Sequence, residues 1–141
     1  MRTFPPAFPS RPVREVRVSW VRQNCCGVFA VATVDVEPGP PGFAVAVAGG
    51  AVRDPAAHRE TAPVFTAALA EGFRAELAAR CPRVPLAVTV VVRELLIHPV
   101  DSTEHAFRMA GRCAAAEAVD RLHGAPPTPV RRTPGRTSTK G

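Results

Sequence analysis

Hydrophobic and polar residues alternate in three stretches of the first third of the chain, and this two-residue period is typical of β-strands with one buried face. In the first stretch Val16, Val18 and Trp20 share one face, while Glu15 and Arg17 lie on the other. The three strands are expected at residues 13–21, 28–36 and 43–48, with a Pro/Gly-rich connection between the second and the third.

A fourth apolar stretch, residues 84–97, gives the strongest strand signal. Four aliphatic side chains share one of its faces: Leu86, Val88, Val90 and Val92. Thr89 and Arg93 interrupt the opposite face, so we expect one face of this strand to pack and the other to be partly solvated.

Two longer segments carry the period of an α-helix. The first, residues 62–80, has an apolar ridge spaced by four residues: Phe65, Leu69, Phe73 and Leu77. Thr61 is its expected N-cap, and Pro63 falls in the first turn, where a missing N–H costs nothing.

The second helix is expected at residues 102–122. One of its sides carries mostly small residues: Phe107, Ala110, Gly111, Ala114, Ala118 and Leu122. Small side chains allow a helix to lie close to its neighbour. Asp101 is the expected N-cap, with Glu104 reaching back as in a capping box.

The order β-β-β-α-β-α predicts an α+β two-layer sandwich, in which a four-stranded sheet carries two helices on one face. A length of 141 residues suits one domain. We expect a proline-rich disordered N-terminus at 1–12, one folded domain at 13–124 and a basic disordered tail at 125–141.

The formal net charge of +6 is concentrated at the two ends of the chain. Residues 1–22 contain five arginines and one carboxylate, and residues 125–141 contain three arginines and Lys140 with no acid. The stretch between them carries nine arginines and eleven carboxylates, so the folded body is nearly neutral. The ends would attract a polyanion such as RNA over long range, or they are simply solvated.

Several classes of function find no support in the sequence. Lys140 is the only lysine, which excludes a P-loop. No signal peptide and no membrane-spanning apolar run is present, so we expect a cytoplasmic protein without membrane contact. The four cysteines lack zinc-ligand spacing and are expected to be reduced, buried thiols, with no metal or other cofactor: Cys25, Cys26, Cys81 and Cys113.

The stretch before the second helix contains the residue types of a hydrolase, namely His98, Asp101, Ser102 and Glu104. All four lie within seven positions, whereas catalytic triads are assembled from separated segments, and no nucleophile-elbow motif is present. An enzyme is therefore not expected.

The segment 97–111 resembles a strand-to-helix loop in the fourth domain of translation elongation factor G, where the strand ends in His-x-Val-Asp-Ser-Ser-Glu. The matching residues are His98, Val100, Asp101, Ser102 and Glu104, with Thr103 in place of the second serine and Phe107 at the aromatic position of the helix. Pattern-level likeness extends over residues 20–121. Pro99 stands where elongation factor G has an acidic residue, and is more like the tetracycline-resistance ribosomal protection proteins.

The chain also departs from that family. The glycine-rich loop before the second strand is shortened to residues 24–27, and residues 53–60 look like an insertion. The GTPase domain and the other domains of the factor are absent from the sequence. The resemblance therefore implies a stand-alone domain with the fold of the second domain of ribosomal protein S5, and not an elongation factor.

In the family, this domain reaches the decoding region of the small ribosomal subunit. The resemblance implies a translation-associated, non-catalytic module that binds small-subunit RNA and transfer RNA as a monomer, with a separate translational GTPase as a further candidate partner. The implied RNA-binding residues are His98, Pro99, Val100, Asp101, Ser102 and Thr103 in the loop, Asn24 and Gly27 in the shortened second loop, and Arg131, Arg132 and Arg136 in the tail.

Three alternatives stay open at this point. Structural capping is the better interpretation of Asp101. For His98, contact with RNA and a merely tolerated surface histidine weigh equally. The competing function is a vestigial or protein-interaction domain that keeps the fold without ribosome binding, and the shortened loop at 24–27 and the near-neutral body favour it.

Overall fold

The structure is a computed structural model of the chain, and it describes residues 7–22 and 27–124. The elements are β1 (Val13–Arg22), β2 (Val28–Pro38), β3 (Gly42–Val47), α1 (Thr61–Arg80), β4 (Ala87–Leu96) and α2 (Glu104–Leu122). All six expected elements are present within a few residues of their expected bounds. Asn24, Cys25, Cys26 and the tail with Arg131, Arg132 and Arg136 lie outside the described residues.

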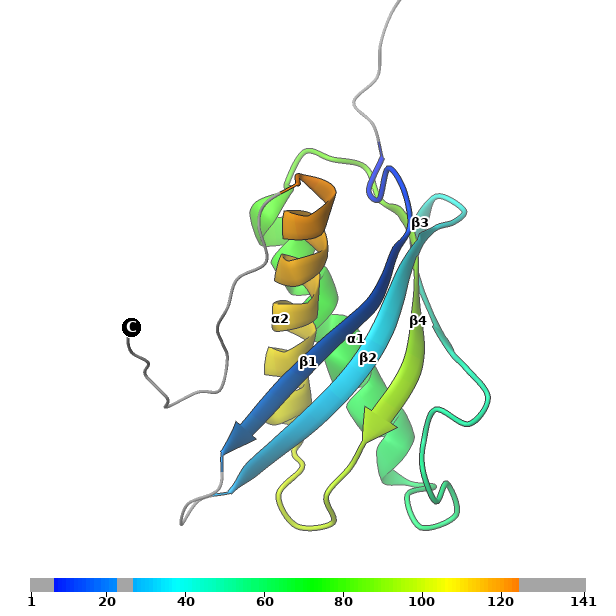
Figure 1. Cartoon of the computed structure of the whole chain (residues 1–141), viewed down its shortest axis with the longest axis vertical. Helices are drawn as coiled ribbons and strands as arrows, with labels where there is room; N and C mark the ends of the chain where they lie inside the picture. The colour runs from blue at the N-terminus through cyan, green and yellow to red at the C-terminus, as the bar shows by residue number, and fades with distance from the viewer. Residues whose placement is uncertain (1–6, 23–26, 125–141) are drawn as a thin grey trace, which may run out of the picture.

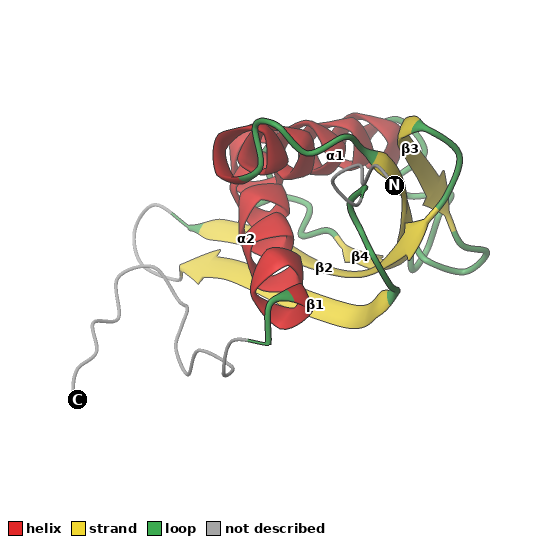
Figure 2. Ribbon diagram, turned by 90° about the horizontal axis from the view of Figure 1, so that it is seen from above, coloured by secondary structure: helices red, strands yellow, loops and turns green. Residues whose placement is uncertain are grey.

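The four strands form one sheet in the order β1-β2-β4-β3. β1 pairs with β2 and β2 with β4 in antiparallel fashion, whereas β3 runs parallel to β4. The parallel pair is joined by a crossover through α1, as parallel strands require. Both helices cover the same face of the sheet (Figures 1 and 2), which confirms the α+β two-layer sandwich.

Aliphatic side chains of the two central strands form the floor of the core. The fully buried ones include Val34, Val36, Val88, Val90 and Val92, each at most 2% exposed. The helices supply the other wall, which includes the predicted ridge of Phe65, Leu69, Phe73 and Leu77. The rings of Phe65 and Phe107 stack with centroids 4.9 Å apart and join the two helices.

The two helices meet along a helix seam, which we define as the contact made by Gly72 of α1 and Gly111 of α2. A Cβ on Gly111 would overlap the carbonyl oxygen of Leu69, and a Cβ on Gly72 would overlap that of Arg108. Because main chain meets main chain on both sides, only a hydrogen atom fits at each position. The predicted stripe of small residues is therefore confirmed as the close-packed side of α2.

The alternation of β1 is broken by a bulge between Val13 and Val16, so that both valines are buried. Glu15 within the bulge has a positive φ of 56°. Its N–H donates to the Asp35 carboxylate over 2.8 Å, and this carboxylate is nearly buried and also lies within 3.7 Å of Arg14 and 3.5 Å of Arg93. A strained backbone position thus has a fixed acceptor on the neighbouring strand.

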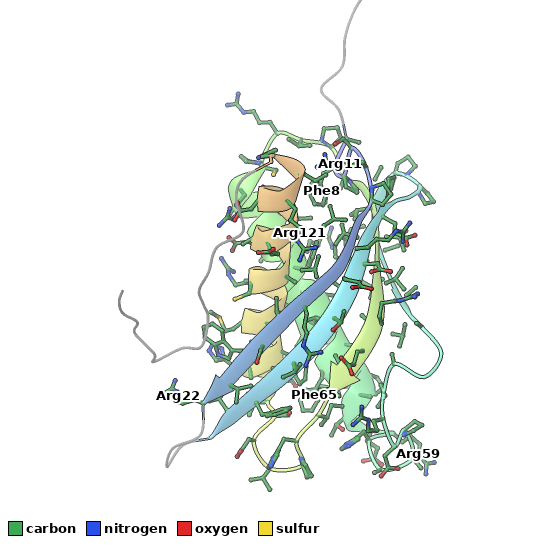
Figure 3. All side chains as sticks on the ribbon, in the orientation of Figure 1. Phe8, Arg11, Arg22, Arg59, Phe65 and Arg121 are labelled. Carbon is green, nitrogen blue, oxygen red and sulfur yellow. The ribbon has the colours of Figure 1, made fainter. Side chains whose placement is uncertain are left out.

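The N-terminal segment corrects an expectation. Residues 1–12 were expected to be disordered, but Phe8 is 5% exposed and exchanges two hydrogen bonds of 2.9 Å with the main chain at Pro85 and Ala87. Arg11 donates to the carbonyls of Arg121 and Leu122 at the end of α2 (Figure 3). Residues 7–12 therefore belong to the folded unit, because Phe8 and Arg11 bond to the main chain near β4 and at the end of α2. Residues 1–6 lie outside the described residues.

The expected cap of α1 is also corrected. Thr61 is already helical, and Glu60 occupies the N-cap position without a side-chain hydrogen bond to the helix. In the described part of the chain, no helix is both long and apolar enough to cross a membrane.

A candidate nucleic-acid interface at the loop between β4 and α2

The residues singled out by the motif form a projecting loop at one end of the molecule, and we call residues 98–103 the tip loop. It connects β4 to α2 at the end where both helices begin (Figure 1). Val100 is 78% exposed, and His98, Pro99 and Thr103 are at least partly exposed as well. Asp101 and Ser102 are half-buried at the base of the loop.

The His98 side chain organises the loop from within. Its Nδ1 accepts hydrogen bonds from the backbone N–H of Val100 at 3.1 Å and of Asp101 at 3.0 Å. A ring nitrogen accepts only when it carries no proton, so the neutral ring holds its proton on Nε2. Nε2 makes no hydrogen bond to any described residue, and the side chain is 44% exposed. His98 therefore shapes the loop and offers a free donor to a ligand.

Ser102 ties the loop to the sheet. Its hydroxyl donates to the Phe29 carbonyl oxygen at 2.7 Å and accepts from the His98 N–H at 2.9 Å. The Phe29 N–H donates in turn to the Asp101 carbonyl oxygen at 3.1 Å, and the Phe29 and His98 rings lie 5.7 Å apart. The loop is thus fastened to the start of β2 through both the N–H and the carbonyl of Phe29.

The capping role assigned to Asp101 is wrong. The N-cap of α2 is Thr103, whose extended backbone precedes Glu104 and whose hydroxyl accepts from the Ala106 N–H at 3.0 Å. Asp101 is held in the turn by its main chain, too early in the chain to reach the helix. Glu104 is the first helical residue, and its carboxylate lies 3.8 Å from Arg108 instead of reaching back.

Gly27 lies directly beside the tip loop. A Cβ at this position would be 2.5 Å from an oxygen of the Asp101 carboxylate, so the missing side chain makes room for that group. The structure thus brings the described residue of the shortened second loop together with the tip loop. Asn24, the other residue expected there, lies outside the described residues.

Two arginines that the sequence analysis did not single out lie at the same end of the molecule. Arg22 ends β1, and Arg59 belongs to the segment before α1; Figure 3 shows both toward the tip end. Both are exposed, and neither has an ion-pair partner among the described residues. Asp101 in the tip loop and Glu104 at the start of α2 carry the opposite charge. Only the fold could reveal this grouping, since the two arginines are 37 positions apart.

The polar side chains of His98 and Ser102 are both engaged by backbone groups. The Ser102 hydroxyl bonds to two backbone groups, and the His98 Nδ1 is occupied by two backbone N–H groups. Among the described contacts, the Ser102 and His98 side chains make no hydrogen bond to each other. No group of three or more potential metal ligands gathers within residues 7–22 and 27–124.

Comparison with known proteins shows the fold alone. No family model matches the chain. A solved protein structure from Thermus thermophilus matches 80% of this chain with a TM-score of 0.53 and 20% sequence identity. The chain spans only 16% of that protein's length.

Proposed function

We propose that this chain is a non-catalytic RNA-contacting module of translation, which uses the tip loop at the decoding region of the small ribosomal subunit as the fourth domain of elongation factor G does. Small-subunit RNA and transfer RNA are the proposed ligands, and a separate translational GTPase is a proposed partner. A cytoplasmic location follows from that role.

The observation that carries the proposal is that some residues of the tip loop hold its shape while others are exposed at its apex. His98 and Ser102, which match the family's motif, hold the loop in one shape through hydrogen bonds to backbone groups. Pro99 and Val100 are left exposed at its apex. A rigid projection loses little entropy on binding, which favours recognition by shape.

The chemistry at this end suits RNA. The exposed face of the His98 ring can stack on an unpaired base, and its Nε2–H can donate to a base edge or a phosphate. Arg22 and Arg59 lie toward the same end of the molecule as the tip loop (Figure 3), and their guanidinium groups are suited to phosphates. The N-termini of α1 and α2 add partial positive charge at the same end.

A ribosome-pelleting assay with two substitutions of one residue tests the proposal. His98→Ala removes both the ring and the loop's internal acceptor, whereas His98→Asn keeps an acceptor near the position of Nδ1 and removes only the ring. We expect about tenfold or greater loss of affinity for both variants, because base stacking on a ring is worth about 1–3 kcal/mol. His123→Asn, at the far end of α2, is the matched control and should pellet like the wild type.

The same assay, extended to a variant without residues 125–141, separates the interpretations. Loss in His98→Ala with retention in His98→Asn would show that the loop's shape matters and the ring does not. Deleting residues 125–141 should weaken binding and flatten its dependence on salt, because four cations are removed. Absence of any salt-sensitive affinity for ribosomes would overturn the proposal and leave a protein-interaction domain that keeps the fold.

A further inference from the structure

The strand β3 forms a free edge of the sheet. Within the described residues it pairs only with β4, and Figure 2 shows it at the border of the sheet beside α1. Its sequence is Gly-Phe-Ala-Val-Ala-Val, without a charge, a proline or a bulge. Edge strands usually carry such features to prevent pairing with another chain, and this one lacks all of them.

The backbone groups left unpaired on β3 can be identified from its register. Gly42 and Ala48 donate to the carbonyls of Leu86 and Val92 across the β4 side. Backbone groups point to alternate sides along a strand, so even-numbered residues face β4. The N–H and C=O groups of Phe43, Val45 and Val47 therefore point away from the sheet, in an evenly spaced row centred on Val45.

We propose that a second copy of this chain pairs with β3 in antiparallel fashion about a two-fold axis at Val45, which makes one continuous eight-stranded sheet. Val45 then exchanges two hydrogen bonds with its own counterpart, and Phe43 exchanges two with the partner's Val47 on each side of the axis. Every outward backbone group of the three residues is satisfied in both copies. Because this row of N–H and C=O groups is symmetric about Val45, β3 of a second copy can pair with all of them. We therefore infer that the partner strand comes from a second copy of this chain.

The side chains fit the same arrangement. Phe43 faces the helix layer, with its ring 6.1 Å from that of Phe73, and Val47 lies on the same face and is 50% exposed. Phe43 also borders an open, mostly apolar groove with Val64 and Ala67 of α1. Pairing at Val45 places the partner's Val47 opposite Phe43, where its exposed surface is covered. On the other face of the sheet, Ala44 of one copy lies opposite Ala46 of the other, and their methyl groups fit without steric conflict.

This inference is independent of the proposed function. Antiparallel pairing directs the two tip loops toward opposite ends of the dimer, so both remain accessible. It differs from the monomer expected from the sequence, since the position of β3 at a sheet edge is known only from the fold.

Sedimentation velocity of the full chain over a range of concentrations gives the first test. We expect a monomer–dimer equilibrium, and Val47→Lys should weaken it by about tenfold or more because the change occurs at two places in the symmetric contact. Val100→Lys introduces the same side chain at an exposed position remote from β3 and should leave the dimer intact. A wild type that stays monomeric up to millimolar concentration would overturn the proposal.

Amide hydrogen exchange measured by NMR on the wild type tests the pairing itself. Amides of Ala44 and Ala46 should be protected at every concentration, since β4 holds them. Amides of Phe43, Val45 and Val47 should become protected only as the dimer forms. A dimer in which these three amides exchange freely uses another surface and contradicts the inference. Because this measurement needs no variant, it decides the matter even where Val47→Lys fails to fold.

Discussion

The helix seam and the tip loop both depend on glycine, but the neighbours of the glycines differ. Gly111 in the seam faces main-chain atoms of Leu69 and Phe73, which cannot move without displacing α1. Gly27 beside the tip loop faces only the carboxylate of Asp101, the end of a half-buried side chain. The seam is therefore fixed by the exclusion of volume, whereas the tip is fixed by hydrogen bonds to backbone groups. The first arrangement stabilises the fold, and the second shapes a surface.

The largest effect is expected from Gly111→Ala. Alanine improves helix propensity by about 1 kcal/mol, but its Cβ has no space, and the overlap should lower the free energy of unfolding by about 3 kcal/mol. Urea denaturation measures this loss. Gly49→Ala is the matched control, because a Cβ there meets no atom within 4 Å, and it should change stability by less than about 0.5 kcal/mol. Equal stability of the two variants would show that α1 and α2 can move apart to admit the Cβ at position 111 without a loss of stability.

A smaller effect is expected from Ser102→Ala in the tip loop. The Phe29 carbonyl and the His98 N–H each lose their side-chain partner, which should cost about 1–2 kcal/mol. Ser19→Ala on the exposed face of β1 is the control, since its hydroxyl makes no hydrogen bond to another described residue. The His98 amide should also exchange faster with solvent while amides in the helix seam stay protected. Faster exchange throughout the helices as well would mean that the loop and the seam are not separate units.

The smallest loss is expected from Gly27→Ala. Its φ is not in the left-handed region, and the Asp101 carboxylate can rotate away, so the cost should stay below about 1 kcal/mol. In an Asp101→Ala background the same substitution should cost nothing, and a double-mutant cycle by urea denaturation measures this coupling. A loss as large as that of Gly111→Ala would show that the tip is as rigid as the seam.

Local sequence was sufficient for the elements and, in the two helices, for the face that each one buries. The four-residue ridge of α1 and the small-residue stripe of α2 are both buried as expected. The start of α2 was placed wrongly because Asp101, Ser102 and Thr103 are all good capping residues, and only the bonds to Phe29 decide which one precedes the helix. The motif also identified the tip loop but not Arg22 or Arg59, whose position toward the same end of the molecule depends on the fold.

By itself, the sequence determined the number, kind and order of the strands and helices, because the period of buried positions is a property of each segment alone. The tertiary structure decided the bulge at Glu15, the burial of Phe8 and the free edge at β3. Each of these depends on a group far away in the chain: the Asp35 carboxylate, the main chain around Pro85, and the place of β4 between β2 and β3. Such contacts leave no periodic signal, since the partners meet only after the sheet has formed.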